Sequence, residues 1–517
     1  MKNNPVKNRR VQPCNVAPDS LKGIPRVQTN PARWNGNGWQ AFVDELVSKG
    51  VAVRMEKRER SIFVTDAGGL AFGLPHGVVR PSSTEDVSKV LTAAQTHRVP
   101  VVTRGGGLSS EGEAIAFGGL LLDMTSMNKV LAIDKDNMTV RTEAGIFWHQ
   151  LAEVLRRDGL DYLSAPLNLT STVGGVIGVG GIDINSPRLG CSADQALALR
   201  VVTPTGEVVD CSNTENRDLF ERVILGYGQF GVITEALLKI RPFTPLKMRY
   251  LYYSSLRIAI EDLQLIVRED ASDYSGILTV MDCAINLLVA FDSDDREREF
   301  DARWRPRLRG RGELNFGIRL AGRYALRPWR IKEALYIIDR RMKMIPDFCR
   351  PEFMRNGKIE DRTVVFSRAV WKFWGSRQMV IPDLAASEGK FIEAVERGNA
   401  VCRKYFKYYT LYCVGIKKFG DLERYEMSCM PQDAKGFAYG CEFEPMLKGM
   451  GYSRDYLQSF KNEIYDIGVD MGLSYYRFGG MMKGYIRRIF GDKLVDKHLE
   501  MKKNADPAMI LNPDVIF

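Results

Sequence analysis

Residues 226–231 read GYGQFG, a spacing of three glycines that binds dinucleotides in Rossmann enzymes. That motif requires a strand before it and a helix after it, because the helix N-terminus meets the pyrophosphate. Here the order is reversed. NRDLFERVIL, before the glycines, has apolar residues at helical spacing, and GVITEALLKI, after them, begins like a strand. The acidic residue expected about 20 positions later is also missing. The pattern therefore argues against a Rossmann nicotinamide site.

Two further glycine-rich stretches lie upstream, TRGGGLSS at 103–110 and STVGGVIGVGGI at 171–182. Glycine allows a ligand to approach the backbone closely, and consecutive N–H groups in such loops hold anions. We expect three glycine-rich turns, each next to apolar strands, to bind an extended phosphate-containing cofactor. Tight packing between strands is the alternative for each turn taken alone.

Around these stretches the chain alternates helices and strands. SSTEDVSKVLTAAQTHRV predicts a capped helix, and ALALRVVTPTGEVVDC predicts a β-hairpin. The pattern of predicted helices and strands changes at RPFTP (241–245), where we place a domain boundary. Beyond it, GILTV, YYTLYCVGI, RQMVIP and GFAYGCEFEP read as strands, and the final stretch reads as a helix followed by a proline-punctuated tail.

Composition narrows the class of protein. The chain has 517 residues, 45% hydrophobic and 26% charged, which is an ordinary globular balance. We see no transmembrane run and no secretory signal, so we expect a cytoplasmic protein. Its nine cysteines are scattered and its histidines number four, which argues against a metal site.

The net charge is +10, and much of the basic excess lies in residues 302–343. A solvated helical face is the simplest interpretation of this segment. An acidic substrate or a membrane surface is the next, and nucleic acid is the weakest because no recognition motif accompanies the charge.

The ordered motifs VVRPSSTEDVSKVLTAAQTHRVPVVTRGGGLSSEGEA, STVGGVIGVGG, DLFERVILGYGQFGVITEALLKIRPF and MKKNADPAMILNPDVIF resemble FAD-linked oxidoreductases of the vanillyl-alcohol oxidase type. These carry the FAD-binding domain first described in p-cresol methylhydroxylase (PCMH). Within that group, LGYGQFGVITEA is most similar to cytokinin dehydrogenases. The resemblance is strong over residues 71–243, clear again over 488–517, and vague between them.

The resemblance implies an α+β fold, in which a discontinuous two-lobed FAD-binding domain of the PCMH type surrounds an inserted substrate domain. The inserted domain is built on an antiparallel sheet with flanking helices. The resemblance thus implies four parts of the chain: an irregular segment 1–35, an FAD-binding domain 36–243, a substrate or cap domain 244–487, and a C-terminal return 488–517 to the FAD-binding domain.

The same match implies a set of cofactor-binding residues. They are Thr103, Gly105, Gly106, Gly107, Ser109, Thr172, Gly174, Gly175, Gly178, Ile182, Ile233 and Asn512. Many relatives attach the flavin covalently to a histidine after the first loop, and some add a cysteine before TVGG. This chain has Leu108 at the first place and Thr170 and Ser171 at the second, so we expect FAD to be held non-covalently.

Catalysis in these relatives passes a hydride from a substrate carbon to the flavin while a nearby base takes a proton. Cytokinin dehydrogenases use an aspartate a few residues before TVGG. The matching position here is about Leu167, with Asn168 beside it, so the resemblance supplies no carboxylate base.

Four residues are candidates for the missing chemistry. Strand alternation in FAYGCEFEP places Tyr439 on one face and Glu442 on the other. Tyr476 and Arg477 lie in SYYRFGG, the segment that enters the active site in relatives. An arginine there holds a substrate carboxylate or balances reduced flavin. Sheet packing and surface exposure are the alternatives. The aromatic residues of WKFWGS (371–376) either wall a planar substrate or pack in the core.

Together these observations predict an FAD-dependent oxidoreductase that acts on a small organic substrate at a C–N or C–OH bond. O₂ or a quinone-like molecule would re-oxidise the cofactor. Amine oxidation like that of cytokinin dehydrogenases, and a membrane-associated FAD dehydrogenase or reductase that docks through 302–343, are the alternatives within the class. A non-catalytic flavin-binding subunit is the alternative outside it.

Overall fold

The computed structural model describes most of the chain, in several stretches. They are residues 36–166, 168–244, 247–280, 284–310, 380–407, 409–417, 430–445, 452–513 and 515–516. The segment 1–35, Leu167, WKFWGS and most of the basic segment 302–343 lie outside these stretches, so the predictions on them stay predictions.

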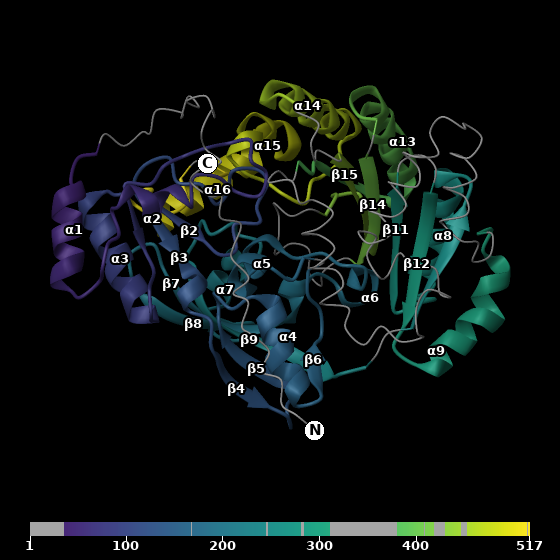
Figure 1. The fold of residues 1–517 in the computed structure, drawn as a ribbon, viewed down its shortest axis with the longest axis horizontal. Helices are drawn as coiled ribbons and strands as arrows, with labels where there is room; N and C mark the ends of the chain where they lie inside the picture. The colour runs from purple at the N-terminus through teal and green to yellow at the C-terminus, as the bar shows by residue number, and fades with distance from the viewer. Residues whose placement is uncertain are drawn as a thin grey trace, which may run out of the picture.

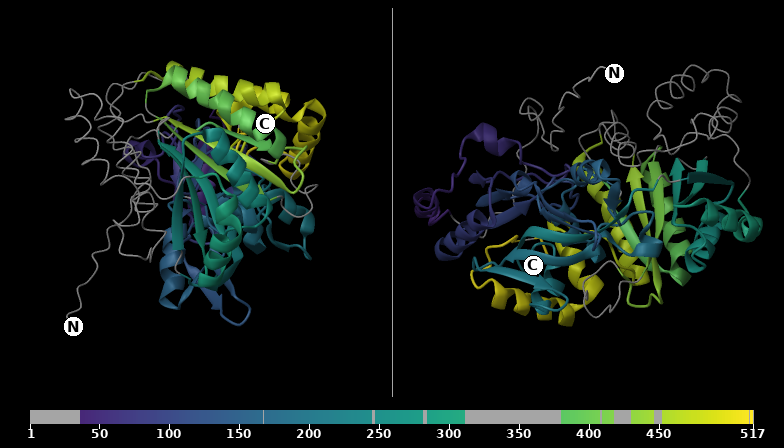
Figure 2. Two further views of the ribbon diagram at one scale, coloured as in Figure 1. Left: turned by 90° about the vertical axis from the view of Figure 1, so that its right-hand side faces the viewer. Right: turned by 90° about the horizontal axis from the view of Figure 1, so that it is seen from below.

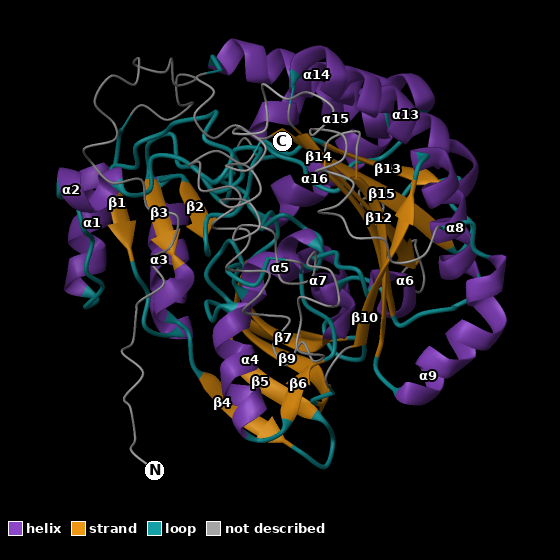
Figure 3. Cartoon of the chain, turned by 45° about the vertical axis from the view of Figure 1, so that its right-hand side comes forward, coloured by secondary structure: helices purple, strands orange, loops and turns teal. Residues whose placement is uncertain are grey.

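The N-terminal part of the chain forms a small parallel sheet of order β1-β3-β2 (Figures 1 and 3). Its strands are β1 (Gly77–Val79), β2 (Val101–Arg104) and β3 (Leu120–Asp123), and its helices are α1 (Trp39–Ser48), α2 (Lys57–Ser61) and α3 (Thr84–His97). Helix α3 begins where the sequence predicts, because the Ser83 side chain accepts the Asp86 N–H at 3.2 Å. Strand β2 then delivers the first glycine loop, which follows it directly.

A second, antiparallel sheet has the order β4-β5-β9-β7-β8, with β6 paired to the end of β9. Its strands are β4 (Val130–Asp134), β5 (Thr139–Glu143), β6 (Leu160–Tyr162), β7 (Ala196–Val202), β8 (Val208–Ser212) and β9 (Val232–Pro242). The predicted hairpin is β7–β8, paired from Val202↔Val208 outward. Helix α7 (Arg217–Val223) precedes the GYGQFG loop and β9 follows it, which confirms the helix–loop–strand order.

Short helices connect the strands of this second sheet. They are α4 (Trp148–Arg157), α5 (Val173–Val179), α6 (Ser186–Leu189) and α7. The expectation of a glycine turn in STVGGVIGVGG is wrong at its centre, because Val173–Val179 form α5. Thr172 caps this helix by accepting the Gly175 N–H at 3.4 Å. The poor helix propensity of glycine is overridden by packing, since a Cβ on Gly174 would come within 2.8 Å of the Ala144 methyl group.

The third sheet is wholly antiparallel, of order β10-β12-β11-β14-β15-β13. Its strands are β10 (Lys247–Tyr253), β11 (Tyr274–Val280), β12 (Ala284–Phe291), β13 (Asp383–Ser387), β14 (Tyr409–Lys417) and β15 (Phe437–Pro445). Its helices are α8 (Leu256–Arg268), α9 (Asp294–Glu299), α13 (Glu388–Tyr405) and α14 (Arg454–Met471). Three of the strands predicted here are confirmed. In RQMVIP, residues 380–382 have no regular structure, and residues 377–379 lie outside the described stretches.

The two faces of the third sheet have different neighbours. Helices α8 and α13 lie on its outer side and α5 lies on the opposite side (Figure 3). Outward residues such as Leu411 and Phe443 share a core with these outer helices, whereas inward Val414 and Ile416 share the core of the second sheet. The inner face therefore looks toward the glycine-rich segments.

After α15 (Lys483–Phe490) and α16 (Asp492–Ala505), the C-terminal residues return to the first sheet. Leu511 forms a parallel bridge with Val101 of β2, and Gln95 of α3 donates to Asp506. Figures 1 and 2 show this yellow segment beside the blue and purple N-terminal elements. The tail thus packs against the first sheet although the two are about 400 residues apart in the sequence.

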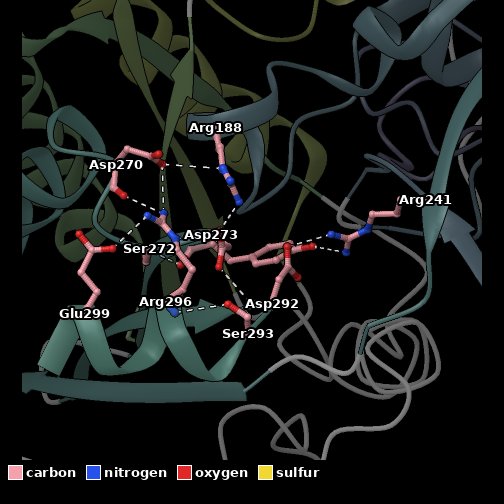
Figure 4. A network of polar contacts seen from close by, with 10 residues as sticks. Arg188, Arg241, Asp270, Ser272, Asp273, Asp292, Ser293, Arg296 and Glu299 are labelled. Carbon is pink, nitrogen blue, oxygen red and sulfur yellow. Dashed lines mark hydrogen bonds and ion pairs between the residues drawn. The ribbon is translucent and has the colours of Figure 1, made fainter.

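A polar network joins the second and third sheets (Figure 4). Asp273, whose side chain is almost wholly buried, pairs with Arg188 of α6, and Arg296 of α9 approaches the same carboxylate at 3.3 Å. Arg241, near the end of β9, donates to Asp292 at 2.9 Å. These bonds hold the third sheet against β9 beside the region where the inner face meets the glycine-rich segments.

Candidate functional site

A cavity of about 290 Å³ lies between the three glycine-rich segments and the inner face of the third sheet. Every cofactor-binding residue predicted from the sequence lines it. These are Thr103, Gly105, Gly106, Gly107, Ser109, Thr172, Gly174, Gly175, Gly178, Ile182, Ile233 and Asn512. Segments more than 400 residues apart along the chain, such as Thr103 and Asn512, therefore meet in one place. Whether each residue touches a cofactor stays a prediction.

The first glycine loop follows β2 and turns sharply over Arg104. Gly107 has φ +68°, and a Cβ there would lie 2.2 Å from the Arg104 guanidinium, so only glycine fits. The guanidinium itself donates to the carbonyl oxygens of Thr65 and Ala114 at 3.0 and 2.8 Å. Gly105 packs directly on Thr172, whose Oγ1 would lie 2.1 Å from an added Cβ. The loop and the start of α5 thus form one continuous backbone surface.

The GYGQFG loop enters the cavity through its second and third glycines, Gly228 and Gly231. Gly228 has φ +68°, and its carbonyl oxygen accepts the Nδ2–H of Asn512 at 2.6 Å. Asn512 Oδ1 in turn accepts the Thr103 N–H at 2.8 Å. One asparagine from the tail therefore ties the third glycine segment to the first.

The positions at which the resemblance would place a flavin-bonding histidine or cysteine are occupied by other residues. Leu108 and Ser171 both line the cavity. Thr170 is buried and donates its hydroxyl to Asn168 Oδ1 at 2.7 Å. No histidine is found among the described residues of the cavity wall. Its one cysteine, Cys441, has its thiol 3.5 Å from the sulfur of Cys413.

The inner face of β15 supplies carboxyl groups to the cavity. Glu442 and Glu444 line it, as does Gly440 on the same face of the strand. The prediction that Tyr439 contributes an acid/base group is wrong, because its side chain lies on the outer face. It is completely buried, with its ring 5.3 Å from that of Phe391 in α13. Side chains alternate between the two faces of β15, so its apolar residues pack against the outer helices and its glutamates face the cavity.

Tyr476 and Arg477 line the cavity from the segment after α14. The Tyr476 hydroxyl accepts the Gly181 N–H at 2.9 Å. The Arg477 guanidinium pairs with the Glu442 carboxylate and donates to Ser110 Oγ at 3.3 Å. Arg477 is therefore not a surface arginine, and its charge is already matched by Glu442.

Sequence reasoning missed two carboxyl groups in the cavity wall, Asp383 and Glu113. Burial raises the pKa of Asp383 to about 7, although Arg477 and the Tyr476 N–H act in the opposite direction. Burial also raises the pKa of Glu113 to about 8, and the carboxylates of Asp66 and Glu111 add to the effect. The sequence signal that could have identified Asp383 is its position as the one charged residue in the apolar stretch VIPDLAA.

Comparison with known proteins bears on this site. Residues 75–212 match the model of a family described as an FAD binding domain, and this supports FAD as the cofactor. Those residues include the first loop and α5. The match leaves open how the FAD is attached.

Several curated proteins are similar over part of their length. The chain is 29% identical over 255 residues to cytokinin dehydrogenase 3 of Arabidopsis thaliana, which covers 48% of this chain and 47% of that protein. It is 32% identical to D-lactate dehydrogenase of Anaerostipes hadrus, covering 32% of this chain and 37% of that protein. For glycolate oxidase subunit GlcD of Bacillus subtilis the identity is 30%, with coverage of 35% and 40%. The matches thus span less than half the length of these relatives.

Within the described stretches, none of the helices combines the length and the apolar character needed to cross a bilayer. Those stretches also contain no group of three or more His, Cys, Asp or Glu side chains arranged to hold a metal ion.

Proposed function

We propose that this protein is an FAD-dependent oxidoreductase that removes a hydride from a small organic substrate at a C–N or C–OH bond. The observation that carries the proposal is the single cavity in which a glycine-rich cradle faces a sheet bearing carboxyl groups. The cradle suits a nucleotide cofactor, and the opposite wall supplies the groups that a proton transfer requires. The names of the similar proteins, which are dehydrogenases and an oxidase subunit, support the same class of reaction.

The residues present fit FAD. The first loop and the residues around Thr172 offer exposed backbone to phosphate groups. Gly178 has no protein atom within 4 Å of an added Cβ, so its side of α5 is open to the cavity. Ile182 and Val414 provide apolar surface for a planar ring. When bound there, FAD would supply the hydride acceptor.

In this proposal the two domains have different functions. Residues 36–243 and 488–517 hold the cofactor, and residues 244–487 form the inserted substrate domain whose sheet roofs it. The tie from Asn512 to Thr103 and Gly228 supports the first part, and the cavity-facing side of β13–β15 supports the second.

The polar residues of the roof have distinct roles in the proposal. Arg477 is a positioning residue, because its ion pair with Glu442 and its bond to Ser110 fix the polar part of the roof. Tyr476 is a positioning residue, because its hydroxyl is bonded to the Gly181 backbone across the cavity. Glu442 holds Arg477 in place and contributes negative charge to the substrate end of the cavity.

Anaerobic reduction tests this function. Full-length protein should carry the absorbance of oxidised flavin as purified, and a true substrate should bleach it without O₂. Re-oxidation by O₂ compared with that by a soluble quinone then identifies the acceptor. Bound flavin that dithionite reduces but that no amine, alcohol or hydroxy acid bleaches would instead indicate a passive flavin-binding subunit.

The attachment of the cofactor gives a separate prediction. Because Leu108, Thr170 and Ser171 replace the residues that bond flavin in relatives, acid precipitation should leave the pellet colourless and release all FAD into the supernatant. Absorbance at 450 nm of both fractions measures this. A yellow pellet that stays yellow after washing in denaturant would contradict non-covalent binding.

A further inference from the structure

The substrate end of the cavity is rich in carboxyl groups and poor in available cations. Glu113, Asp383, Glu442 and Glu444 all line it. Lysine and histidine are absent from the described cavity wall, and its arginines are Arg104 and Arg477. Arg104 donates to two backbone carbonyl groups below the first loop, and Arg477 is paired with Glu442. A substrate carboxylate would therefore find no uncommitted cation in the described wall, whereas a substrate cation would find carboxyl groups that it can stabilise in their ionised form.

Asp383 is one of the carboxyl groups that line this region. It is the first residue of β13 and is only 5% exposed. Its Oδ1 accepts the Tyr476 N–H at 2.6 Å, and this bond fixes the orientation of the carboxyl group. The charged groups that act on it are Arg477 from the segment after α14, Glu442 on the paired strand β15 and Glu111, which directly follows the first glycine loop. Asp383 is thus held by the backbone and surrounded by groups from three elements.

Glu442 and Glu444 continue the carboxyl-rich region along β15. They are two residues apart on the same face of the strand, and Glu444 Oε2 accepts the Thr410 hydroxyl at 2.7 Å. Burial raises the pKa of Glu444 well above its usual range, and the adjacent Glu442 raises it further. A cation placed between these groups would favour their ionised forms, so cation binding and proton release from the wall are coupled.

We propose that the substrate of this site is an alkylammonium compound without a carboxylate, and that Asp383 accepts its proton. This rests on the proposed function. The Asp383 carboxylate takes one proton from R–CH₂–NH₃⁺ and leaves the free amine. The C–H bond then breaks, its electron pair and hydrogen pass as a hydride to FAD, and R–CH=NH₂⁺ remains. The positive charge carried by both substrate and product lies beside Glu442 and Glu444.

The protonation of Asp383 gives the reaction a pH dependence. Only the ionised carboxylate can accept a proton, and burial places the pKa of Asp383 at about 7. The rate of cofactor reduction should therefore rise about tenfold per pH unit below pH 7 and level off above it. Loss of the carboxylate removes this inflection.

Ligand binding to the full-length holoprotein tests the substrate class without requiring turnover. Benzylammonium, benzyl alcohol and mandelate share one ring and differ in charge, and each is titrated against the visible spectrum of bound FAD. We expect benzylammonium to perturb the spectrum with a Kd at least tenfold below those of the other two. Equal or tighter binding of mandelate, or no perturbation by benzylammonium, overturns the proposal. Protein that binds no FAD would instead overturn the proposed function.

Asp383→Asn tests the proton acceptor, since its amide oxygen can still accept the Tyr476 N–H. With the amine that bleaches the wild-type cofactor fastest, reduction should slow by about 10²–10⁴-fold. FAD content should not change, and the rise with pH around 7 should vanish. The matched control is Asp433→Asn, which removes a half-exposed carboxylate bonded to Ser387 at the far end of β13. Unchanged rates in Asp383→Asn, or an equal loss in the control, overturn the role of Asp383.

Discussion

Replacing Lys461 with methionine is expected to lower the free energy of unfolding by about 3–5 kcal/mol. Lys461 of α14 and Glu111 of the first glycine loop form an ion pair at 2.5 Å, with side chains 0% and 1% exposed. The ammonium group also donates to the Ser110 carbonyl oxygen. Methionine keeps the length and apolar character of the side chain but leaves the Glu111 carboxylate buried without its cation, which is the costly part of breaking such a pair.

Urea denaturation followed by circular dichroism measures the loss. The double variant Lys461→Met/Glu111→Leu removes both charges, so it should recover much of the stability that Lys461→Met loses. The exposed pair of Arg397 and Asp470 on neighbouring α13 and α14 offers a control, because Asp470→Asn should cost at most about 1 kcal/mol. If the double variant is no more stable than the single one, the buried charge is not the cause.

Gly105→Ala is expected to weaken FAD binding by at least 100-fold, an estimate that corresponds to about 2.7 kcal/mol. The added Cβ would lie 2.1 Å from Thr172 Oγ1, so the first glycine loop and the start of α5 must move apart. These two segments make up the cradle on which the proposed cofactor rests. Fluorescence titration of the apoprotein with FAD measures the change.

Two further variants separate this clash from a general effect of alanine. Gly389, in the first turn of α13, has no atom within 4 Å of an added Cβ, so Gly389→Ala should leave FAD binding unchanged. In Gly105→Ala/Thr172→Gly the clashing side chain is gone, and glycine is tolerated at a helix N-cap. Binding should then recover in part. A double variant as weak as Gly105→Ala would exclude Thr172 as the obstacle.

The glycine-rich side of the site was predictable from the sequence because its chemistry depends on backbone. A Cβ at Gly107 would clash with Arg104 and one at Gly105 would clash with Thr172, so both positions require glycine and the sequence shows this directly. The same holds for α7 and β9 around GYGQFG, whose apolar periods differ clearly.

The roof of the site was harder to predict because strand alternation gives two faces without saying which one is inside. From the sequence alone, Tyr439 and Glu442 are equally good candidates. The structure distinguishes them, because the face of β15 that carries Tyr439 packs against the outer helices. Asp383 gave only a weak signal, since its importance arises from Tyr476 and Glu442, residues far away in the chain that tertiary contacts bring beside it. The helix α5 was missed because packing against Ala144 outweighs glycine's helix propensity.

The bond between Asn512 and Thr103 has a consequence for biosynthesis. The two residues are separated by 409 positions, and the bridge of Val101 with Leu511 spans a similar interval. At translation rates of about 5–20 residues per second, the segment around Asn512 is synthesised roughly 20–80 s after the first glycine loop to which it binds. During that interval the third sheet is synthesised and can fold around its own helices. The proposed cofactor cradle is therefore completed only once the segment around Asn512 has left the ribosome, and we expect nascent chains that lack this segment to bind FAD poorly.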